Sequence, residues 1–90
     1  MKNADLLAST ADLKKTLLIY YDCTPPLKIT ALLYEQKTKT IYLVHKPNVS
    51  LNLITLHSKL KMYPLDCSLK FEDQKNVFGF KITSEKLLLK

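Results

Sequence analysis

Residues 27–44 read LKITALLYEQKTKTIYLV, two apolar runs on either side of a polar tip. Both runs are rich in β-branched and aromatic residues, which favour strands. The pattern predicts a hairpin of two strands, residues 27–34 and 40–45, joined by residues 35–39. The side chains expected to face inward are Leu27, Ile29, Ala31, Leu33, Ile41 and Leu43.

Further strands are predicted on both sides of this hairpin. Residues 16–21 form an apolar run before it. Val49–Leu56 is a predicted strand after it, in which Val49, Leu51 and Leu53 alternate with Ser50 and Asn52. Leu60–Tyr63 completes five short strands between residues 15 and 65, which is typical of a small barrel or sandwich. Asn3 is the expected N-cap of a short helix that precedes them.

The C-terminal residues are expected to form an extension. Cys67–Phe71 and Val77–Ile82 are predicted strands, and a helix from Thr83 or Ser84 is expected to reach Leu89. Gly79 indicates a bulge or a close backbone approach. We find no internal repeat, and we divide the chain into a barrel, residues 1–66, and an extension, residues 67–90.

Composition limits the functional classes. The chain has 90 residues and a net charge of +6, and all of its 14 basic residues are lysine. Lysine neutralises phosphate or aids solubility, but lacks the planar fork with which arginine reads bases. No run reaches the ~20 apolar residues of a membrane span, and no secretory signal is expected. Two cysteines, Cys23 and Cys67, favour a reducing compartment.

No enzyme chemistry is predicted. The carboxylates fall at expected turns and helix starts, where they cap or are solvated. His45 and His57 could be combined with the two cysteines, but no pair has the close spacing of a zinc site. There is also no glycine-rich phosphate loop. We expect no catalytic residue, no metal and no cofactor.

Three segments resemble the Sm fold. Asp5-Leu6-Leu7 followed by residues 14–19 resembles its N-terminal helix and first strand, residues 27–44 resemble its Sm1 region, and residues 55–62 resemble its Sm2 region. The resemblance covers residues 4–66. It implies a mainly β protein, a small Sm-like five-stranded open barrel with a short N-terminal helix and a C-terminal extension.

The chain departs from RNA-binding Sm proteins at their functional positions. Their aspartate and asparagine at the Sm1 tip fall on Glu35 or Gln36 and on Lys39, and their arginine-glycine pair falls on Leu56-His57. The family's second-strand glycine falls near Ile29 or Thr30. In lacking these RNA-binding residues, the chain resembles the Gemin pair of the SMN complex.

The resemblance implies a non-catalytic adaptor subunit of a complex that assembles spliceosomal ribonucleoproteins. The expected partner is another Sm-fold protein, bound as a heterodimer by pairing of strand edges within a larger assembly. The expected location is cytoplasm and nucleus, with RNA contact indirect and no membrane partner. The interface residues expected are Val49, Leu51, Leu53, Ile54, Leu56, Leu60 and Met62.

Two other interpretations remain open. The chain could be a small Sm-like protein that binds single-stranded RNA, with lysines on phosphates and tyrosines stacked on bases. The residues expected to contact RNA are Lys28, Tyr34, Lys37, Lys39, Tyr42, Lys59 and Lys61. A small phage or viral protein with an unrelated β-fold that inhibits a host factor is also compatible with the sequence.

Overall fold

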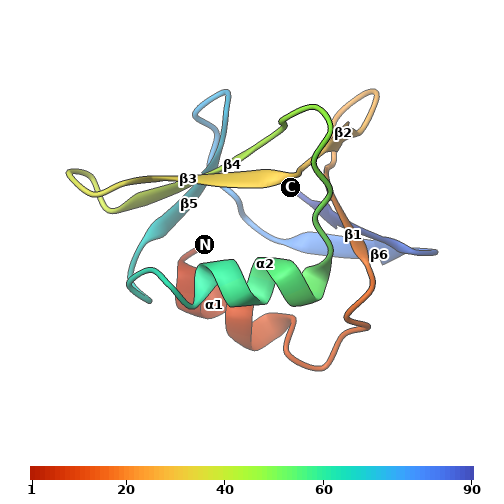
Figure 1. The fold of residues 1–90 in the computed structure, drawn as a ribbon, viewed down its shortest axis with the longest axis horizontal. Helices are drawn as coiled ribbons and strands as arrows, with labels where there is room; N and C mark the ends of the chain where they lie inside the picture. Colours follow the sequence, from red (N-terminus) through yellow and green to blue (C-terminus); the bar gives the residue numbers. More distant parts are fainter.

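Two helices and seven strands make up the fold, in a computed structural model that describes residues 1–90 (Figure 1). The elements are α1 (Asn3–Ser9), β1 (Leu18–Tyr21), β2 (Leu27–Lys28), β3 (Ala31–Glu35), β4 (Thr40–Val44), α2 (Leu53–Leu60), β5 (Ser68–Phe71), β6 (Phe80–Thr83) and β7 (Lys86–Leu89).

The strands form two mixed sheets. Sheet A has three strands in the order β3-β4-β5, and sheet B has four in the order β2-β1-β7-β6. In each sheet one pair is parallel, β4 with β5 and β1 with β7, and the other pairs are antiparallel. The protein is therefore mainly β, as predicted, but its strands do not form the expected five-stranded open barrel.

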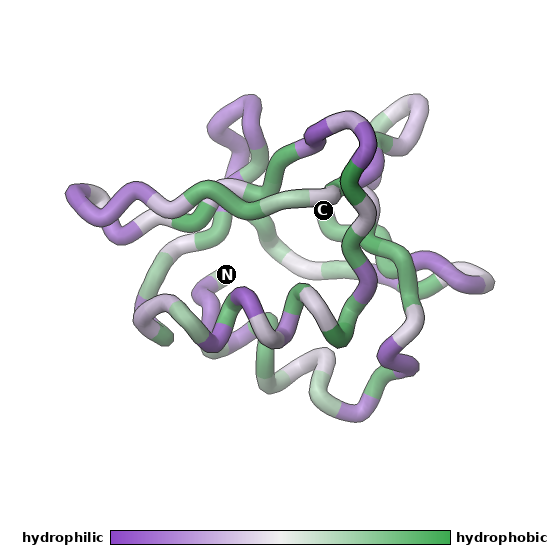
Figure 2. The backbone as a smooth tube through the Cα atoms, in the orientation of Figure 1, coloured by the Kyte–Doolittle hydropathy of each residue, from purple (hydrophilic) through white to green (hydrophobic).

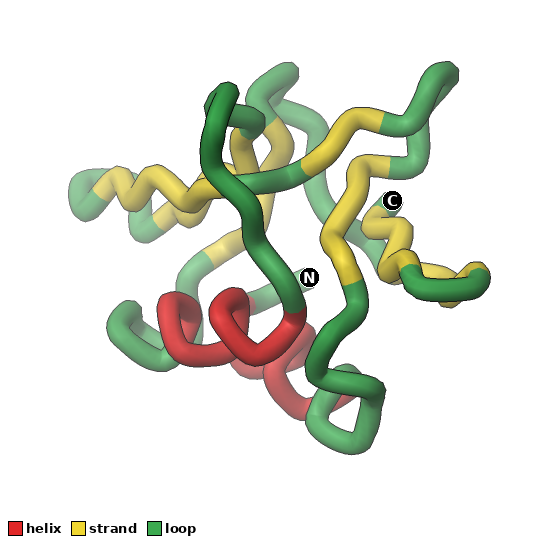
Figure 3. The backbone as a smooth tube through the Cα atoms, turned by 45° about the vertical axis from the view of Figure 1, so that its right-hand side comes forward, coloured by secondary structure: helices red, strands yellow, loops and turns green.

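One hydrophobic core lies between the two sheets and the helices. Figures 1 and 3 show both helices on the same side of the strands, and Figure 2 shows that the tip between β3 and β4 is hydrophilic and projects outward. Sixteen buried residues form this core: Leu6, Leu17, Ile19, Ile29, Ile41, Leu43, Leu51, Leu53, Leu56, Leu60, Cys67, Leu69, Phe71, Val77, Leu87 and Leu89.

The chain contains an internal repeat, so the expectation of none is wrong. Residues 1–44 contain α1, β1, β2, β3 and β4, and residues 51–90 contain α2, β5, a bridge at Asn76, β6 and β7 in the same order. Lys2 pairs with Ser68, and Asn52 pairs with Leu18. Both helices and both first strands therefore correspond at a spacing of 50 positions, Lys2 to Asn52 and Leu18 to Ser68.

The two halves exchange strands around an approximate twofold axis. β1 of the first half lies parallel to β7 of the second, and β5 of the second lies parallel to β4 of the first. Such reciprocal contacts define a twofold arrangement. Tyr21 and Phe71 are equivalent residues, and their rings stack with centroids 3.7 Å apart and planes 7° apart. This contact between equivalent residues lies on the axis.

The segment that was expected to form the fourth strand is a helix. Asn52 caps α2, since its side-chain oxygen accepts a hydrogen bond from the Thr55 backbone N–H at 3.1 Å. Leu53, Leu56 and Leu60 follow at helical spacing and are fully buried. The expected strands Val49–Leu56 and Leu60–Tyr63 are therefore wrong, because a cap and a 3.6-residue period outweigh the short alternation.

The N-terminal helix is confirmed, with a different cap. The Asp5 carboxylate accepts a hydrogen bond from the Lys2 backbone N–H at 2.9 Å, so Lys2 and not Asn3 is the N-cap. Asn3 is buried inside the helix and donates from Nδ2 to the carbonyl oxygen of Leu60 at 2.8 Å. It thus ties the start of α1 to the end of α2.

Residues 67–90 belong to the same folded unit as the rest of the chain. The predicted strand at Cys67–Phe71 is confirmed as β5, but the expected terminal helix is wrong, since Lys86–Leu89 is strand β7. Both strands pair with strands of the first half. The division at residue 66 therefore does not match the sheets.

The chain passes from one sheet to the other at Ile29 and Thr30. The Ile29 backbone N–H donates to Ile19 of sheet B, and the Thr30 backbone N–H donates to Val44 of sheet A, both at 2.9 Å. Leu33 consequently faces outward, contrary to the predicted face, whereas Ile41 and Leu43 are buried as predicted.

In the second half the corresponding change of sheet is at Val77 and Phe78, and Gly79 follows it at the position equivalent to Ala31. Gly79 exchanges backbone hydrogen bonds with Lys90 at 2.9 and 3.0 Å. A Cβ atom placed on it would meet nothing within 4 Å. The close backbone approach is therefore wrong. The bulge, the other expectation for this glycine, is confirmed, because the backbone N–H groups of Phe78 and Gly79 both donate to the Lys90 carbonyl oxygen, at 2.6 and 2.9 Å.

Candidate functional site

The outer face of sheet A carries apolar side chains that no other element covers. Leu33 of β3 pairs with Tyr42 of β4, and both lie on the face opposite the buried Ile41 and Leu43. Leu33 is 49% exposed. Val44 is on the same face of β4, because side chains two residues apart share a face, but it is only 5% exposed and forms the floor of this surface.

These side chains lie in an open groove of about 630 Å³. The groove is formed by β3, β4 and the turn after β5, and the residues that line it are Leu33, Tyr34, Glu35, Tyr42, Val44, His45, Lys46, Glu72 and Gln74. An apolar centre with a few polar groups around it is the usual composition of a binding site.

Hydrogen bonds hold the polar residues of the groove in place. The Glu72 carboxylate accepts a hydrogen bond from the His45 backbone N–H at 2.7 Å, and the Tyr42 hydroxyl donates to Gln74 Oε1 at 3.3 Å. His45 Nδ1 lies 2.9 Å from the carbonyl oxygen of Lys28. Since a carbonyl only accepts, Nδ1 carries the proton in this contact.

Strand β3 forms one side of the groove and is the free edge of sheet A. The other edge strand, β5, is partly paired, because Ser68 bridges to Lys2 and Lys70 bridges to Asn76. Proteins usually protect free edges with charges, proline or bulges. Residues 31–34 of β3 are Ala-Leu-Leu-Tyr, so this edge is apolar and available to another strand.

Most of the interface predicted from the sequence is buried inside the chain. Leu51, Leu53, Leu56 and Leu60 are at most 1% exposed, so their assignment to a protein interface is wrong. The exposed members of the predicted set are Val49, Ile54 and Met62. Because residues 49–63 form no strand, they offer no edge for pairing.

The residues predicted to contact RNA do not form one surface. Tyr34 packs against the core and its ring centroid lies 4.8 Å from that of Tyr63. The others are dispersed over β2, β4, the β3–β4 tip and the end of α2: Lys28, Tyr42, Lys37, Lys39, Lys59 and Lys61.

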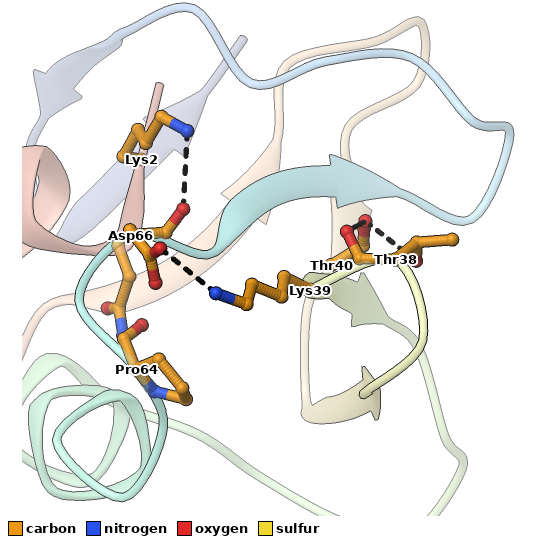
Figure 4. Close-up of polar contacts among 7 residues, drawn as sticks. Lys2, Thr38, Lys39, Thr40, Pro64 and Asp66 are labelled. Atoms are coloured by element: carbon orange, nitrogen blue, oxygen red, sulfur yellow. Dashed lines mark hydrogen bonds and ion pairs between the residues drawn. The ribbon is translucent and has the colours of Figure 1, made fainter.

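Lys39, one of these residues, is engaged by an acid. Its Nζ lies 3.4 Å from the carboxylate of Asp66, and Lys2 Nζ donates to the Asp66 carbonyl oxygen at 3.3 Å. Figure 4 shows both contacts. Both side chains of the ion pair are 62% exposed, so water screens it strongly. It nevertheless lowers the positive charge that Lys39 offers to a phosphate.

His57 is a buried titratable group between the helices. Its Nε2 lies 2.7 Å from the Thr10 hydroxyl, which itself donates to the Leu6 carbonyl oxygen at 2.7 Å. Because the Thr10 hydroxyl already donates its proton to Leu6, it accepts the hydrogen bond from His57, so Nε2 carries a proton. Burial lowers the pKa of His57 below 6.5, and the nearby charges of Lys15 and Lys61 lower it further.

Acid is expected to destabilise the fold through His57. Between pH 6.5 and the lower pKa of the folded state, the unfolded chain binds a proton that the folded chain does not. The free energy of unfolding should therefore fall as the pH drops below about 6.5 and be constant above it. Urea denaturation from pH 8 to pH 5 measures this, and His57→Gln should remove the dependence.

The matched control is His45→Gln, because His45 is exposed at the groove. This variant should retain the fall in stability below pH 6.5. An equal slope for the wild type and His57→Gln would contradict the assignment to His57.

The structure brings no three His, Cys, Asp or Glu side chains together as a metal site, and Cys23 and Cys67 are both free. Neither helix is long and apolar enough to cross a membrane.

No family model, no curated protein and no solved structure matches the chain. Its function is therefore inferred from the groove and the edge of β3.

Proposed function

We propose that the chain is a non-catalytic adaptor that binds an extended segment of a partner protein along β3. The observation that supports this most is the position of an apolar, unpaired edge strand beside an open groove. A strand added to β3 would form backbone hydrogen bonds with it, and alternate side chains would provide specificity. Its apolar side chains would contact Leu33 and Tyr42.

The groove also indicates the kind of segment that fits. Leu33, Tyr42 and Val44 favour an apolar or aromatic side chain, which is the usual centre of a protein interface. Glu35 and Glu72 are acidic and Lys46 is basic, so polar residues of either charge suit the ends of the segment. This retains the pairing of strand edges expected from the sequence, but moves it from residues 49–63 to β3.

The proposal includes a narrower role, in which the adaptor acts in spliceosomal ribonucleoprotein assembly and binds an Sm-fold partner. The identity of the partner tests this narrower role. An Sm-fold protein held along β3 would support it. A different partner held there would remove this narrower role and leave the adaptor function intact.

The test uses Leu33→Lys. The equivalent residue of β6 is Lys81, so a lysine is compatible with a strand at this position. Affinity purification with quantitative mass spectrometry should recover a partner with the wild type and lose it at least tenfold with the variant, because central apolar side chains dominate interfaces. The control is Phe78→Lys, since Phe78 is 78% exposed and lies outside the groove.

Hydrogen exchange of the purified complex locates the contact. The partner should slow exchange at the amides of β3 and leave those of β6 unchanged. A partner that binds Leu33→Lys as well as the wild type would overturn the proposal. Self-association of the chain through β3 would also overturn it.

A further inference from the structure

Sheet B has a second uncovered face, which differs in charge from the groove. Its outward residues are Leu18, Tyr20, Lys28, Lys81, Thr83, Lys86 and Leu88, which we call the cationic face. They are opposite the inward Ile19, Leu87 and Leu89, which are fully buried. Leu88 is only 7% exposed, so the accessible part of the cationic face is made by the other six residues. Both helices pack on the inward side, so neither covers this face.

Four of these residues form one row across the sheet. Lys28 of β2 pairs with Tyr20 of β1, Tyr20 with Leu88 of β7, and Leu88 with Lys81 of β6. Neighbouring strands lie about 4.8 Å apart, so the backbones of the two outer lysines are roughly 14 Å apart. An aromatic and an aliphatic side chain thus lie between two positive charges.

A third lysine is held at the aromatic residue. Lys86 Nζ lies 5.0 Å from the centroid of the Tyr20 ring, within the range of a cation–π contact. Two acids lie next to this face. Asp22 is 3.4 Å from Lys81, whose side chain is 51% exposed, and Glu85, which precedes Lys86, pairs with Lys14 at 2.9 Å. Such an exposed ion pair is weak, so the face keeps a net positive charge.

The repeat shows that the fold does not require these charges. The equivalent residues on sheet A are Ser68, Lys70, Asn76, Leu33, Glu35, Thr40 and Tyr42. That face carries one lysine and one glutamate. The same backbone therefore supports a neutral face, and the fold does not require the three lysines on sheet B.

We propose that the cationic face binds single-stranded nucleic acid. Lys28, Lys81 and Lys86 would neutralise phosphates, and a base would stack on Tyr20. Bases of a single strand stack on aromatic side chains without sequence preference, which fits a chain that has lysine and no arginine. This site lies on the other sheet from the proposed protein-binding groove and does not depend on it.

Binding of a labelled ten-residue oligouridine, followed by fluorescence anisotropy at several salt concentrations, tests the proposal. Three neutralised phosphates predict a log–log salt slope of about −2, since each contributes about −0.7 on a single strand. The triple variant Lys28→Gln, Lys81→Gln, Lys86→Gln should bind at least tenfold more weakly and with a slope near zero.

The control removes the same charge elsewhere. In Lys37→Gln, Lys59→Gln, Lys61→Gln the three lysines are exposed and lie outside the cationic face. This variant should keep its affinity within about threefold and its salt slope unchanged, because phosphates contact the protein locally. Thermal melts establish that both variants remain folded.

The aromatic part of the site needs a separate variant. Tyr20→Leu should weaken oligouridine binding roughly tenfold at an unchanged salt slope, and should not affect binding of a base-free ribose-phosphate chain. Three results would each overturn the proposal: equal losses in the two triple variants, no binding by the wild type, or equal affinity for a duplex of the same length.

Discussion

Phe71→Ala is expected to lower the free energy of unfolding by about 3–5 kcal/mol, the range for removing a buried phenylalanine. Phe71 is 1% exposed and its ring stacks on Tyr21 at the twofold axis, where the two halves meet. The truncation removes this contact and leaves a cavity in the shared core. Urea denaturation measures the change.

Phe78→Ala is the matched control, because the same substitution at an exposed side chain should change stability by at most about 0.5 kcal/mol. Small domains have only about 5–15 kcal/mol of stability, so Phe71→Ala can approach complete unfolding. Phe71→Leu then provides a milder variant, with a smaller loss in the same direction. A loss below about 1 kcal/mol for Phe71→Ala would show that the axis contact is unimportant.

Cleavage between the halves is expected to leave them associated. Residues 45–50 join β4 to α2 and are exposed, so a protease site can be inserted there. After cleavage the two pieces should elute together in size-exclusion chromatography and keep the circular dichroism of the intact chain. The reason is that β1 and β4 have parallel partners only in the other half.

Each piece alone should be unfolded. A chain of about 40 residues buries too little surface to be stable by itself, and here it would lose its central strand pairing. Mixing the separated pieces should restore the fold in a concentration-dependent way. Uncut chain carrying the same inserted site is the control. Pieces that separate after cleavage, or one piece that folds alone as a monomer, would contradict the exchange of strands.

The local elements of the first half could be predicted well. The polar tip between residues 35 and 39, the strand after it and the N-terminal helix all follow from local patterns. The single strand predicted at residues 27–34 is instead divided into β2 and β3, which belong to different sheets. The apolar run at residues 16–21 also became a strand, β1. In these segments the apolar spacing and the turn residues favour the same structure.

The errors came from segments with two competing patterns. Val49–Leu53 alternates like a strand, yet the Asn52 cap and the helical spacing of apolar residues from Leu53 onward favour a helix. The apolar face of this helix is buried in the core. In the tail, the predicted helix cap at Thr83 or Ser84 is wrong: Thr83 ends β6, and Ser84 has a positive φ of 50° in the turn between β6 and β7. The three leucines after that turn are central to sheet B.

The groove could not be predicted because both faces of β3 are apolar, and only the change of sheet at Ile29 and Thr30 determines which face is outward. Two groove residues, Tyr34 and Tyr42, are indicated by the sequence, but as RNA contacts. The polar residues of the turn after β5 gave no signal, since they approach β4 only through the parallel pairing of β4 and β5.

The repeat was hidden for a related reason. Among the structurally equivalent positions of the helices and strands, Leu6 with Leu56 and Leu43 with Leu89 are the identical pairs. What the halves share is the placement of apolar residues, such as Ile19 with Leu69 and Ile29 with Val77. A core fixes size and hydrophobicity more than residue identity.

Joining both halves in one polypeptide also has a consequence for evolution. A dimer of two identical chains of half this length could associate as the two halves do here. Every surface substitution would then occur twice, once on each side of the symmetry axis. Fusion through residues 45–50 removes that constraint. One copy could acquire lysines while the other kept its leucine and tyrosine, and a symmetric ancestor could become a molecule with two chemically different sides.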